Sequence, residues 1–231
     1  MEILVLGDKR RATELMQRIP KEHQVTHSTK VNDASLPKYN IIFDLNFDDD
    51  SNNLQYYSYL RNKVIIVGAV KTQLAEAVFN FHGEVRCHLI GMNTLPTFID
   101  RDLMEVSLLD NEDLPLLETL SQTLNWPYKL VQDRVGMVTP RVVFMIINEA
   151  CYTLQEGTAN IKDIDLAMKL GTNYPYGPFE WADHIGIKEV YETLAAVYED
   201  TKDERYKICP LLKRQYLRNQ PFYAAETTKG S

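Results

Sequence analysis

Short apolar runs separated by segments of helical spacing dominate the first half of the chain. Continuous runs at residues 3–6, 41–45 and 64–67 are typical of strands that are buried on both faces. Further strands are expected at residues 23–29, 85–92, 103–109 and 126–131. Helical spacing lies between several of them, for example at residues 9–19 and 73–81. Alternation of strand and helix predicts a mostly parallel sheet.

The second half shows helical patterns only. Beyond Gly136 the strand pattern stops, and Thr139 followed by Pro140 predicts a helix start that continues to Gly157. The first half of that helix is apolar nearly all round, which predicts burial on two sides, by its own domain and by a partner subunit. Further helices are expected at residues 160–171, 179–185, 187–198 and 203–217, with Gly171 closing the first of these and Pro210 interrupting the last.

Polar clusters between these elements predict loops and caps. Residues 30–40 are polar, contain Pro37 and are expected to form a loop. Asp48–Asp50 are expected to cap a helix that starts near Ser51, and Asp113 to cap a helix that ends near Leu124.

The stretch from Gly171 to Glu180 connects two of the predicted helices. It holds two glycines and two prolines within eight residues, so it is neither a helix nor a central strand. Tyr174, Tyr176 and Phe179 lie within it. The aromatic side chains predict a packed corner inside a helical domain.

Composition narrows the class of protein. The 231 residues are 45% hydrophobic and 25% charged, as in a soluble globular protein of one large or two small domains. The net charge of −7 argues against nucleic acid or an anionic membrane as the main partner. Three widely spaced cysteines, Cys87, Cys151 and Cys209, predict reduced thiols in a cytoplasmic protein, and no metal-ligand spacing is present among Cys and His.

The first predicted strand, helix and strand form the usual beginning of a nucleotide-binding sheet. Its glycine-rich fingerprint positions hold Gly7, Lys9 and Ala12. Gly7 fits the tight turn, and Ala is tolerated at the third position. Lys9 places a long side chain where the backbone should approach the pyrophosphate, and His27 and Ser28 stand where an acidic residue would bind the ribose. The candidate cofactor-binding residues are Gly7 and Lys9.

Several motifs of the second half resemble the 3-hydroxyacyl-CoA dehydrogenase family in order and spacing. They are Asn148-Glu149-Ala150, Glu156-Gly157, Ile164-Asp165-Leu166-Ala167-Met168-Lys169-Leu170-Gly171 and Tyr174-Pro175-Tyr176-Gly177-Pro178-Phe179-Glu180. Upstream, Ile90-Gly91-Met92 and Leu103-Met104-Glu105-Val106 are similar to the strands that flank the catalytic histidine of that family.

The resemblance implies a shortened Rossmann-like domain at residues 1–135 and an all-helical dimerisation domain at residues 136–231. It also implies an NAD-dependent oxidation of 3-hydroxyacyl-CoA to 3-ketoacyl-CoA, in which a His removes the hydroxyl proton and a Glu orients the His. The expected partners are an acyl-CoA ligand and a second copy of the chain, which contacts the first through the helical domain.

Carried over residue by residue, much of this machinery is substituted. Asn93 stands at the position of the catalytic His, Glu105 stands at the spacing of the orienting Glu, and Pro140 replaces an Asn. The family's substrate-binding Ser-Asn-Thr-Ser stretch is replaced by Gly68-Ala69-Val70-Lys71, with Thr72 the nearest hydroxyl. An amide can donate a hydrogen bond to a ketone but takes up no proton, and loss of a general base costs about 10²–10⁴-fold in rate.

Two hypotheses of different class follow. The first is a divergent NAD-dependent dehydrogenase of weak or lost activity, with Asn93 and Glu105 as its candidate catalytic residues. The second is a non-catalytic dimeric acyl-CoA-binding or interaction protein. The substitutions at Lys9, Asn93 and Pro140 favour the second, whereas the intact helical domain fits both, so whether the chain is an enzyme stays open at this point.

Overall fold

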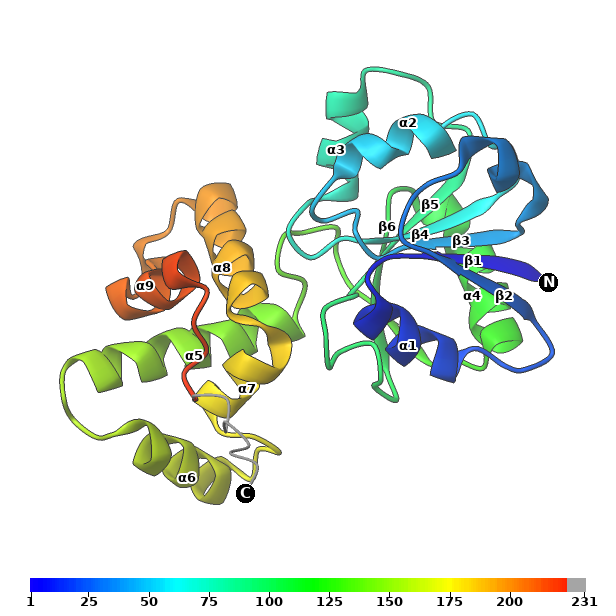
Figure 1. Ribbon diagram of the computed structural model, residues 1–231. Helices are drawn as coiled ribbons and strands as arrows, with labels where there is room; N and C mark the ends of the chain where they lie inside the picture. The colour runs from blue at the N-terminus through cyan, green and yellow to red at the C-terminus, as the bar shows by residue number, and fades with distance from the viewer. Residues whose placement is uncertain (224–231) are drawn as a thin grey trace. The chain divides into compact units, whose positions relative to one another are not determined.

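A computed structural model describes residues 1–223, which divide into two compact units. The first unit is Met1–Val138 and contains all strands of the described residues (Figure 1). The second unit begins at Thr139 and consists of helices over its described part. A mostly parallel, Rossmann-like sheet followed by helices confirms the fold class that the hydrophobic pattern predicted.

The first unit is built on a seven-stranded sheet in the order β2-β1-β3-β4-β5-β6-β7. The strands are β1 (Glu2–Leu6), β2 (Gln24–Ser28), β3 (Ile41–Asp44), β4 (Val64–Gly68), β5 (His88–Met92), β6 (Met104–Leu108) and β7 (Tyr128–Leu130). All neighbouring strands are parallel except β5 and β6, which are antiparallel. The chain leaves β1 for β2 on one side and returns to β3 on the other, so the strand order reverses between β1 and β3. In open α/β sheets, ligands bind at the carboxyl ends of the strands at such a reversal.

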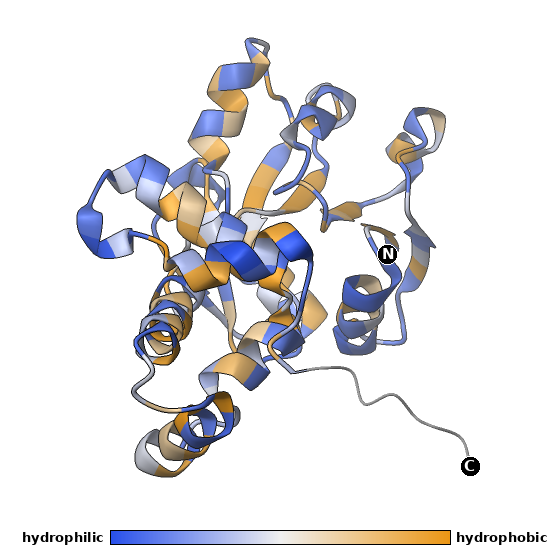
Figure 2. Cartoon of the chain, turned by 60° about the vertical axis from the view of Figure 1, so that its left-hand side comes forward, coloured by the Kyte–Doolittle hydropathy of each residue, from blue (hydrophilic) through white to orange (hydrophobic). Residues whose placement is uncertain are grey.

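Helices cover both faces of this sheet, which is why its central strands are mostly apolar. Helices α1 (Lys9–Arg18) and α4 (Leu114–Leu124) lie on one face, and α2 (Leu54–Tyr57) and α3 (Leu74–Phe81) lie on the other (Figure 1). Every residue of β3 and β4 is buried. Side chains from α1, the sheet and α4 form one continuous core that includes Leu15, Phe43, Ile66, Leu120 and Trp126. The sheet is accordingly the most hydrophobic layer of the unit (Figure 2).

Some local expectations for this unit were wrong. Residues 33–38 form a 3₁₀ helix (Asp33–Lys38) where a loop was expected. Asp113 precedes α4, but its side chain accepts no hydrogen bond from the helix backbone. Its Oδ1 lies 2.7 Å from Nδ1 of His88, at the amino end of β5, and this hydrogen-bond contact takes the place of a cap. Asp110 supplies the cap of the short 3₁₀ helix before α4 by accepting from the N–H of Glu112.

The second unit packs five helices over its described residues. They are α5 (Thr139–Gln155), α6 (Ile161–Thr172), α7 (Pro178–Ile185), α8 (Ile187–Thr201) and α9 (Pro210–Arg218). Pro210 starts α9, as its position predicted, but α6 continues through Gly171 and ends at Thr172, followed by the C-cap Asn173 in a left-handed conformation. Phe144 of α5 is fully buried, whereas Val142 on another side of the same helix is 55% exposed.

A buried carboxylate explains the corner between α6 and α7. Asp165 is 1% exposed and accepts hydrogen bonds from the N–H groups of Phe179 and Glu180, at 2.8 and 3.0 Å. These N–H groups belong to the first turn of α7 and have no partner within the helix. A Cβ on Gly177 would lie 2.3 Å from Cβ of Asp165. Only glycine therefore allows the chain to approach the carboxylate so closely.

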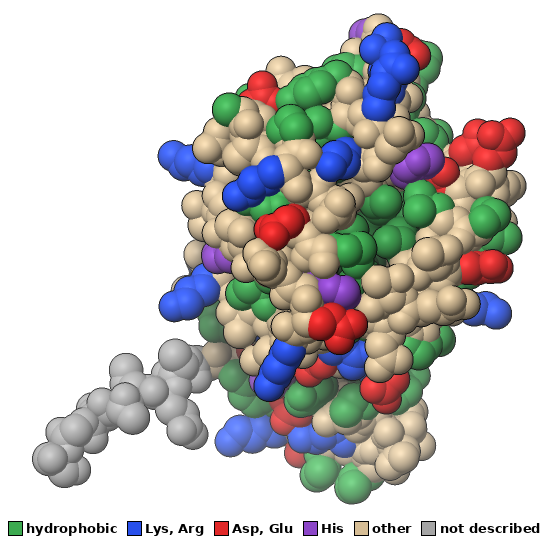
Figure 3. Space-filling model, turned by 90° about the vertical axis from the view of Figure 1, so that its right-hand side faces the viewer, with side chains coloured by type: hydrophobic (Ala, Val, Ile, Leu, Met, Phe, Trp, Pro, Cys, Tyr) green, Lys and Arg blue, Asp and Glu red, His purple; other side chains and the backbone are tan. Residues whose placement is uncertain are grey.

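The surface of the molecule mixes charges of both signs. On the face that Figure 3 draws, Lys and Arg side chains lie among Asp and Glu side chains, with apolar side chains between them. Within residues 1–223, no helix combines the length and the apolar composition that crossing a bilayer requires.

The close contact at Gly177 predicts an asymmetric result for two glycine substitutions. Gly177→Ala should lower the free energy of unfolding by about 1–3 kcal/mol, because the added methyl group overlaps Asp165. Gly171→Ala is the matched control, since its Cβ would meet nothing within 4 Å and Gly171 lies inside α6. It should be neutral or stabilise by up to about 1 kcal/mol. Urea unfolding of both variants measures the difference, and equal effects would contradict this account of the corner.

Candidate functional site

The carboxyl ends of β1 and β3 form the crevice where a nucleotide-binding sheet holds its ligand. Gly7 follows β1 with φ +153°, and a Cβ at this position would lie 2.8 Å from Cβ of Leu45, which follows β3. The two connections therefore touch at the backbone of Gly7. The glycine at the first fingerprint position is needed for this approach.

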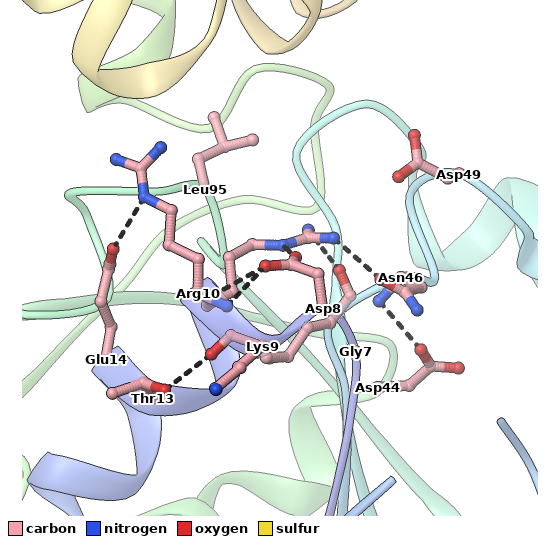
Figure 4. A network of polar contacts seen from close by, with 12 residues as sticks. Gly7, Asp8, Lys9, Arg10, Thr13, Glu14, Asp44, Asn46, Asp49 and Leu95 are labelled. Carbon is pink, nitrogen blue, oxygen red and sulfur yellow. Dashed lines mark hydrogen bonds and ion pairs between the residues drawn. The ribbon is translucent and has the colours of Figure 1, made fainter. Parts of the chain in front are cut away.

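Asp8 caps the helix that leaves this crevice. Its Oδ1 accepts hydrogen bonds from the N–H groups of Arg10 and Arg11, at 2.9 and 3.0 Å (Figure 4). In dinucleotide-binding folds, the free N–H groups at this helix start bind the pyrophosphate. In this chain they bind a carboxylate of the chain itself. Lys9 is the exposed first residue of α1, and its carbonyl accepts a hydrogen bond from the Thr13 hydroxyl at 2.7 Å.

Arg11 bridges the residues that follow the two strands. Its Nε bonds Oδ2 of Asp8, its Nη1 bonds the carbonyl of Leu45 at 2.5 Å, and its Nη2 bonds Oδ1 of Asn46 at 2.8 Å. Asp8 and Asn46 both lie near Gly7 in Figure 4. The Arg11 residue is 7% exposed, so its charge is turned inward. We call Asp8, Arg11 and their bonds to residues 45 and 46 the Asp8–Arg11 clasp.

The clasp also sets the charge state of Asp8. Partial burial opposes ionisation, but the Arg11 side chain, together with the N–H groups of Arg11 and Arg10, outweighs it and holds the pKa of Asp8 below its usual value. The ionised carboxylate is thus the form that the clasp stabilises. An incoming pyrophosphate would meet a negative charge at the place where it needs donors.

Asp48 occupies a second group of backbone donors at the same edge of the sheet. Its carboxylate accepts from the N–H groups of Val70, Lys71 and Thr72, at 2.7–3.2 Å. The expectation that Asp48–Asp50 cap one helix was therefore wrong for Asp48, which holds the loop after β4. Asp50 alone accepts such a bond, from the N–H of Asn52 at 3.2 Å.

The neighbouring Asp49 neutralises a lysine of the same loop. Nζ of Lys71 lies 3.0 Å from Oδ1 of Asp49, and the Lys71 side chain is only 7% exposed. Lys71 belongs to the segment that replaces the substrate-binding Ser-Asn-Thr-Ser stretch expected from the resemblance.

Asn93 and Glu105 lie side by side at the ends of β5 and β6. The N–H of Asn93 donates to the carbonyl of Glu105 at 3.1 Å, and Nδ2 of Asn93 donates to Oε2 of Glu105 at 3.4 Å. Oδ1 of Asn93 accepts from the N–H of Leu95 at 3.3 Å, and Asn93 is 3% exposed. The amide thus has partners on both its nitrogen and its oxygen. The structure brings together the two candidate catalytic residues, and the pair contains no group that exchanges a proton as an imidazole does.

Thr94 adds a polar group that the sequence did not single out. It is fully buried, and its Oγ1 has no hydrogen-bond partner among the described residues. A Cβ on Gly68 would lie 2.5 Å from this hydroxyl. Thr94 therefore lies against the end of β4, beside the loop that Asp48 holds.

Pro140 and Arg141 belong to the second unit. Pro140 is buried in the first turn of α5, and Nη1 of Arg141 donates to the hydroxyl of Tyr206 at 3.3 Å. No group of three or more His, Cys, Asp or Glu side chains in residues 1–223 is arranged to hold a metal ion.

Solved structures of other proteins share this fold. The crystal structure of Mycobacterium tuberculosis FadB2 aligns with a TM-score of 0.78 at 16% identity, covering 96% of this chain and 98% of that one. The (S)-3-hydroxybutyryl-CoA dehydrogenase PaaH1 from Ralstonia eutropha aligns with a TM-score of 0.73 at 19% identity, covering 94% and 93% of the two chains. The chain therefore shares the fold of these two proteins, a Rossmann-like sheet unit and a helical unit.

Sequence comparison relates the second unit to a known protein family. Residues 136–225 match the family model of the 3-hydroxyacyl-CoA dehydrogenase C-terminal domain. The 3-hydroxyadipyl-CoA dehydrogenase of Escherichia coli K12 is 44% identical over 87 residues, which are 38% of this chain and 18% of that protein. The 3-hydroxybutyryl-CoA dehydrogenase of Bradyrhizobium diazoefficiens is 33% identical over 121 residues, 52% of this chain and 41% of that one. Residues 136–225 therefore belong to the C-terminal domain family of the 3-hydroxyacyl-CoA dehydrogenases, and the chain matches less than half the length of either relative.

The NAD that this family implies does not fit the residues at the strand-order reversal. A pyrophosphate needs the N–H groups of the first turn of α1, two of which Asp8 takes, and the place at the carboxyl ends of β1 and β3, which Arg11 takes. Sequence reasoning found Gly7 and Lys9 but missed Asp8 and Arg11. An Asp directly before a helix, with an Arg three residues later, is a recognisable cap and ion-pair pattern.

Asp48 makes the free energy of unfolding depend on pH in a defined direction. Burial raises the pKa of its carboxyl from the usual 3.8 to about 6, although the three N–H groups favour the ionised form. Its contribution to stability is fully present below about pH 4 and is lost as the pH rises through 6. Asp48→Asn removes the titrating group, so this part of the fall between pH 4 and 6 should disappear.

Urea unfolding of wild type and variant at each pH measures this difference. Asp50→Asn is the matched control, because Asn also caps a helix and the exchange leaves Asp48 in place. Identical pH profiles for wild type and Asp48→Asn would show that the Asp48 carboxyl titrates alike in the folded and unfolded chains.

Proposed function

We propose that this chain is a 3-hydroxyacyl-CoA dehydrogenase relative with weak or lost dehydrogenase activity. The observation that carries the proposal is the pair of Asn93 and Glu105. Asn93 stands where the family has its catalytic His, and its amide nitrogen lies 3.4 Å from the carboxylate that would orient that His. The positioning carboxylate is retained, whereas the group that should exchange the proton is an amide.

The chemistry of the family shows why this substitution matters. Oxidation of a 3-hydroxyacyl thioester requires a group that accepts the hydroxyl proton while a hydride leaves for the cofactor. His does this near neutral pH, but an Asn amide does not. The Nδ2 group of Asn93 can donate hydrogen bonds, and one of them goes to Glu105.

The helical unit supports the remaining part of the proposal. Its match to the family model spans residues 136–225, and Asp165 and Gly177 hold its corner together. Leu166 and Leu170 of α6 are 52% and 78% exposed, and Val142 of α5 is 55% exposed. We propose that this unit binds a second copy of the chain, as the resemblance implies, and that an acyl-CoA is the ligand.

Turnover tests the proposal directly. With acetoacetyl-CoA and NADH, the full chain should consume NADH at least about 10²–10⁴-fold more slowly than a 3-hydroxybutyryl-CoA dehydrogenase assayed in parallel, because Asn93 replaces the His that serves as general base. Absorbance of NADH follows the reaction, and calorimetry with acetoacetyl-CoA alone reports whether the acyl-CoA binds without turnover. Binding without turnover would favour the non-catalytic alternative.

Glu105→Gln gives the matching control. The residual rate should be the same in this variant, since Glu105 has no His to orient. A wild-type rate close to that of the reference enzyme, lost in Glu105→Gln, would overturn the proposal and make the Asn93–Glu105 pair a working site.

A further inference from the structure

The phosphate-binding elements of the sheet are occupied by groups of the chain itself. N–H groups in the first turn of α1 donate to Asp8. The Arg11 guanidinium lies at the carboxyl ends of β1 and β3. We infer that the Asp8–Arg11 clasp closes the dinucleotide site, so that the wild-type chain does not take up NAD or NADH at the strand-order reversal. This inference deepens the proposed function and rests on its family assignment.

Arg11 does not act as a phosphate ligand in this arrangement. A guanidinium attracts phosphate when its fork of N–H groups faces solution. Here Nε, Nη1 and Nη2 each bond an oxygen of the chain, and the Arg11 side chain is 8% exposed. Drawing Arg11 toward a ligand would leave the carbonyl of Leu45 without this donor and separate the arginine from Asp8. An unpaired buried charge or carbonyl is costly, so the closed state is favoured.

Asp8 excludes the pyrophosphate by charge as well as by position. Its carboxylate is held in the ionised form and occupies the positive end of α1, where the helix dipole favours a single anion. A pyrophosphate would have to displace the carboxylate or bind beside it. Both routes place like charges together, which opposes binding.

Lys9, which lies between Asp8 and Arg11 in the sequence, also opposes binding of a pyrophosphate. Lys9 replaces the second fingerprint glycine, so its Cβ lies where the backbone should approach the phosphate. Asp8, Lys9 and Arg11 therefore surround the position that the pyrophosphate would occupy. Gly7 is retained because the approach of β1 to Leu45 requires it, with or without a cofactor.

Opening the clasp in the full chain tests the inference. The variant Asp8→Ala/Lys9→Gly/Arg11→Ala frees the donors of α1 and removes the buried side chain. Isothermal calorimetry with NADH and with ADP-ribose should show no saturation for the wild type at millimolar ligand and binding that is at least about tenfold tighter for the triple variant. Arg10→Ala is the matched control, because the Arg10 side chain is 53% exposed and lies outside the clasp. It should behave as the wild type does.

Each result of the calorimetry experiment either supports or overturns the inference. Saturation of the wild type below millimolar ligand overturns the inference, and so does a triple variant that is folded by circular dichroism but gains no binding. If the triple variant does not fold, the ¹⁵N spectrum of the wild type replaces it. Backbone signals of Arg10 and Arg11 that stay in place with ADP-ribose support the clasp, and signals that move overturn it.

The two proposals fail in different ways. Tight NADH binding by the wild type without turnover would contradict the inference that the clasp closes the dinucleotide site. It would not contradict the proposed function. Turnover by the triple variant at the rate of a family dehydrogenase would remove the proposed function, because Asn93 would then suffice, and would leave the clasp standing.

Discussion

Aspartate carboxylates that accept hydrogen bonds from backbone N–H groups hold the connections of both units in place. The first N–H groups of a helix have no partner within the helix, and a carboxylate is the strongest neutralising group for them. Asp8 serves α1, Asp133 serves the start of α3 through the N–H groups of Leu74 and Ala75, and Asp165 serves α7. Asp48 does the same for the loop after β4. These bonds fix loops that would otherwise be the least constrained parts of the fold.

The same bonds have a consequence for function. In a nucleotide-binding sheet, the backbone donors at the carboxyl edge are left for the ligand. In this chain Asp8 and Asp48 take donors at that edge, and Arg11 bridges the loops after β1 and β3. The sheet is thereby stabilised without a bound anion. The residues at this edge and the amide at position 93 therefore differ from those that the family resemblance implies.

Much of the fold could be predicted because parallel strands that are buried on both faces have continuous runs of apolar residues in the sequence. Strands β1, β3 and β4 lie where the runs predicted them, and the change to helical spacing marks the second unit. The limits of prediction were set by contacts that are distant along the chain. Arg11 reaches Leu45 and Asn46, 34 and 35 residues on, so local spacing indicated a helix face but not a filled crevice. Asp48 was expected to serve the next helix, yet its partners lie 22–24 residues on.

For the candidate site, the sequence located Asn93 and Glu105 through the resemblance, and the structure adds their hydrogen bond and the partners that occupy the amide. The end of α6 was predicted wrongly for a local reason. Glycine is the usual residue at a helix end, so Gly171 was expected to close the helix, but the C-cap is Asn173, which adopts the left-handed conformation.

A crystal structure of the full wild-type chain grown with excess NADH tests the central claim most directly. We expect Arg11 to be bonded to Asp8, Leu45 and Asn46, with no dinucleotide at the carboxyl ends of β1 and β3. A pyrophosphate bonded to the N–H groups of Arg10 and Arg11, with the Asp8 carboxylate displaced, would contradict it.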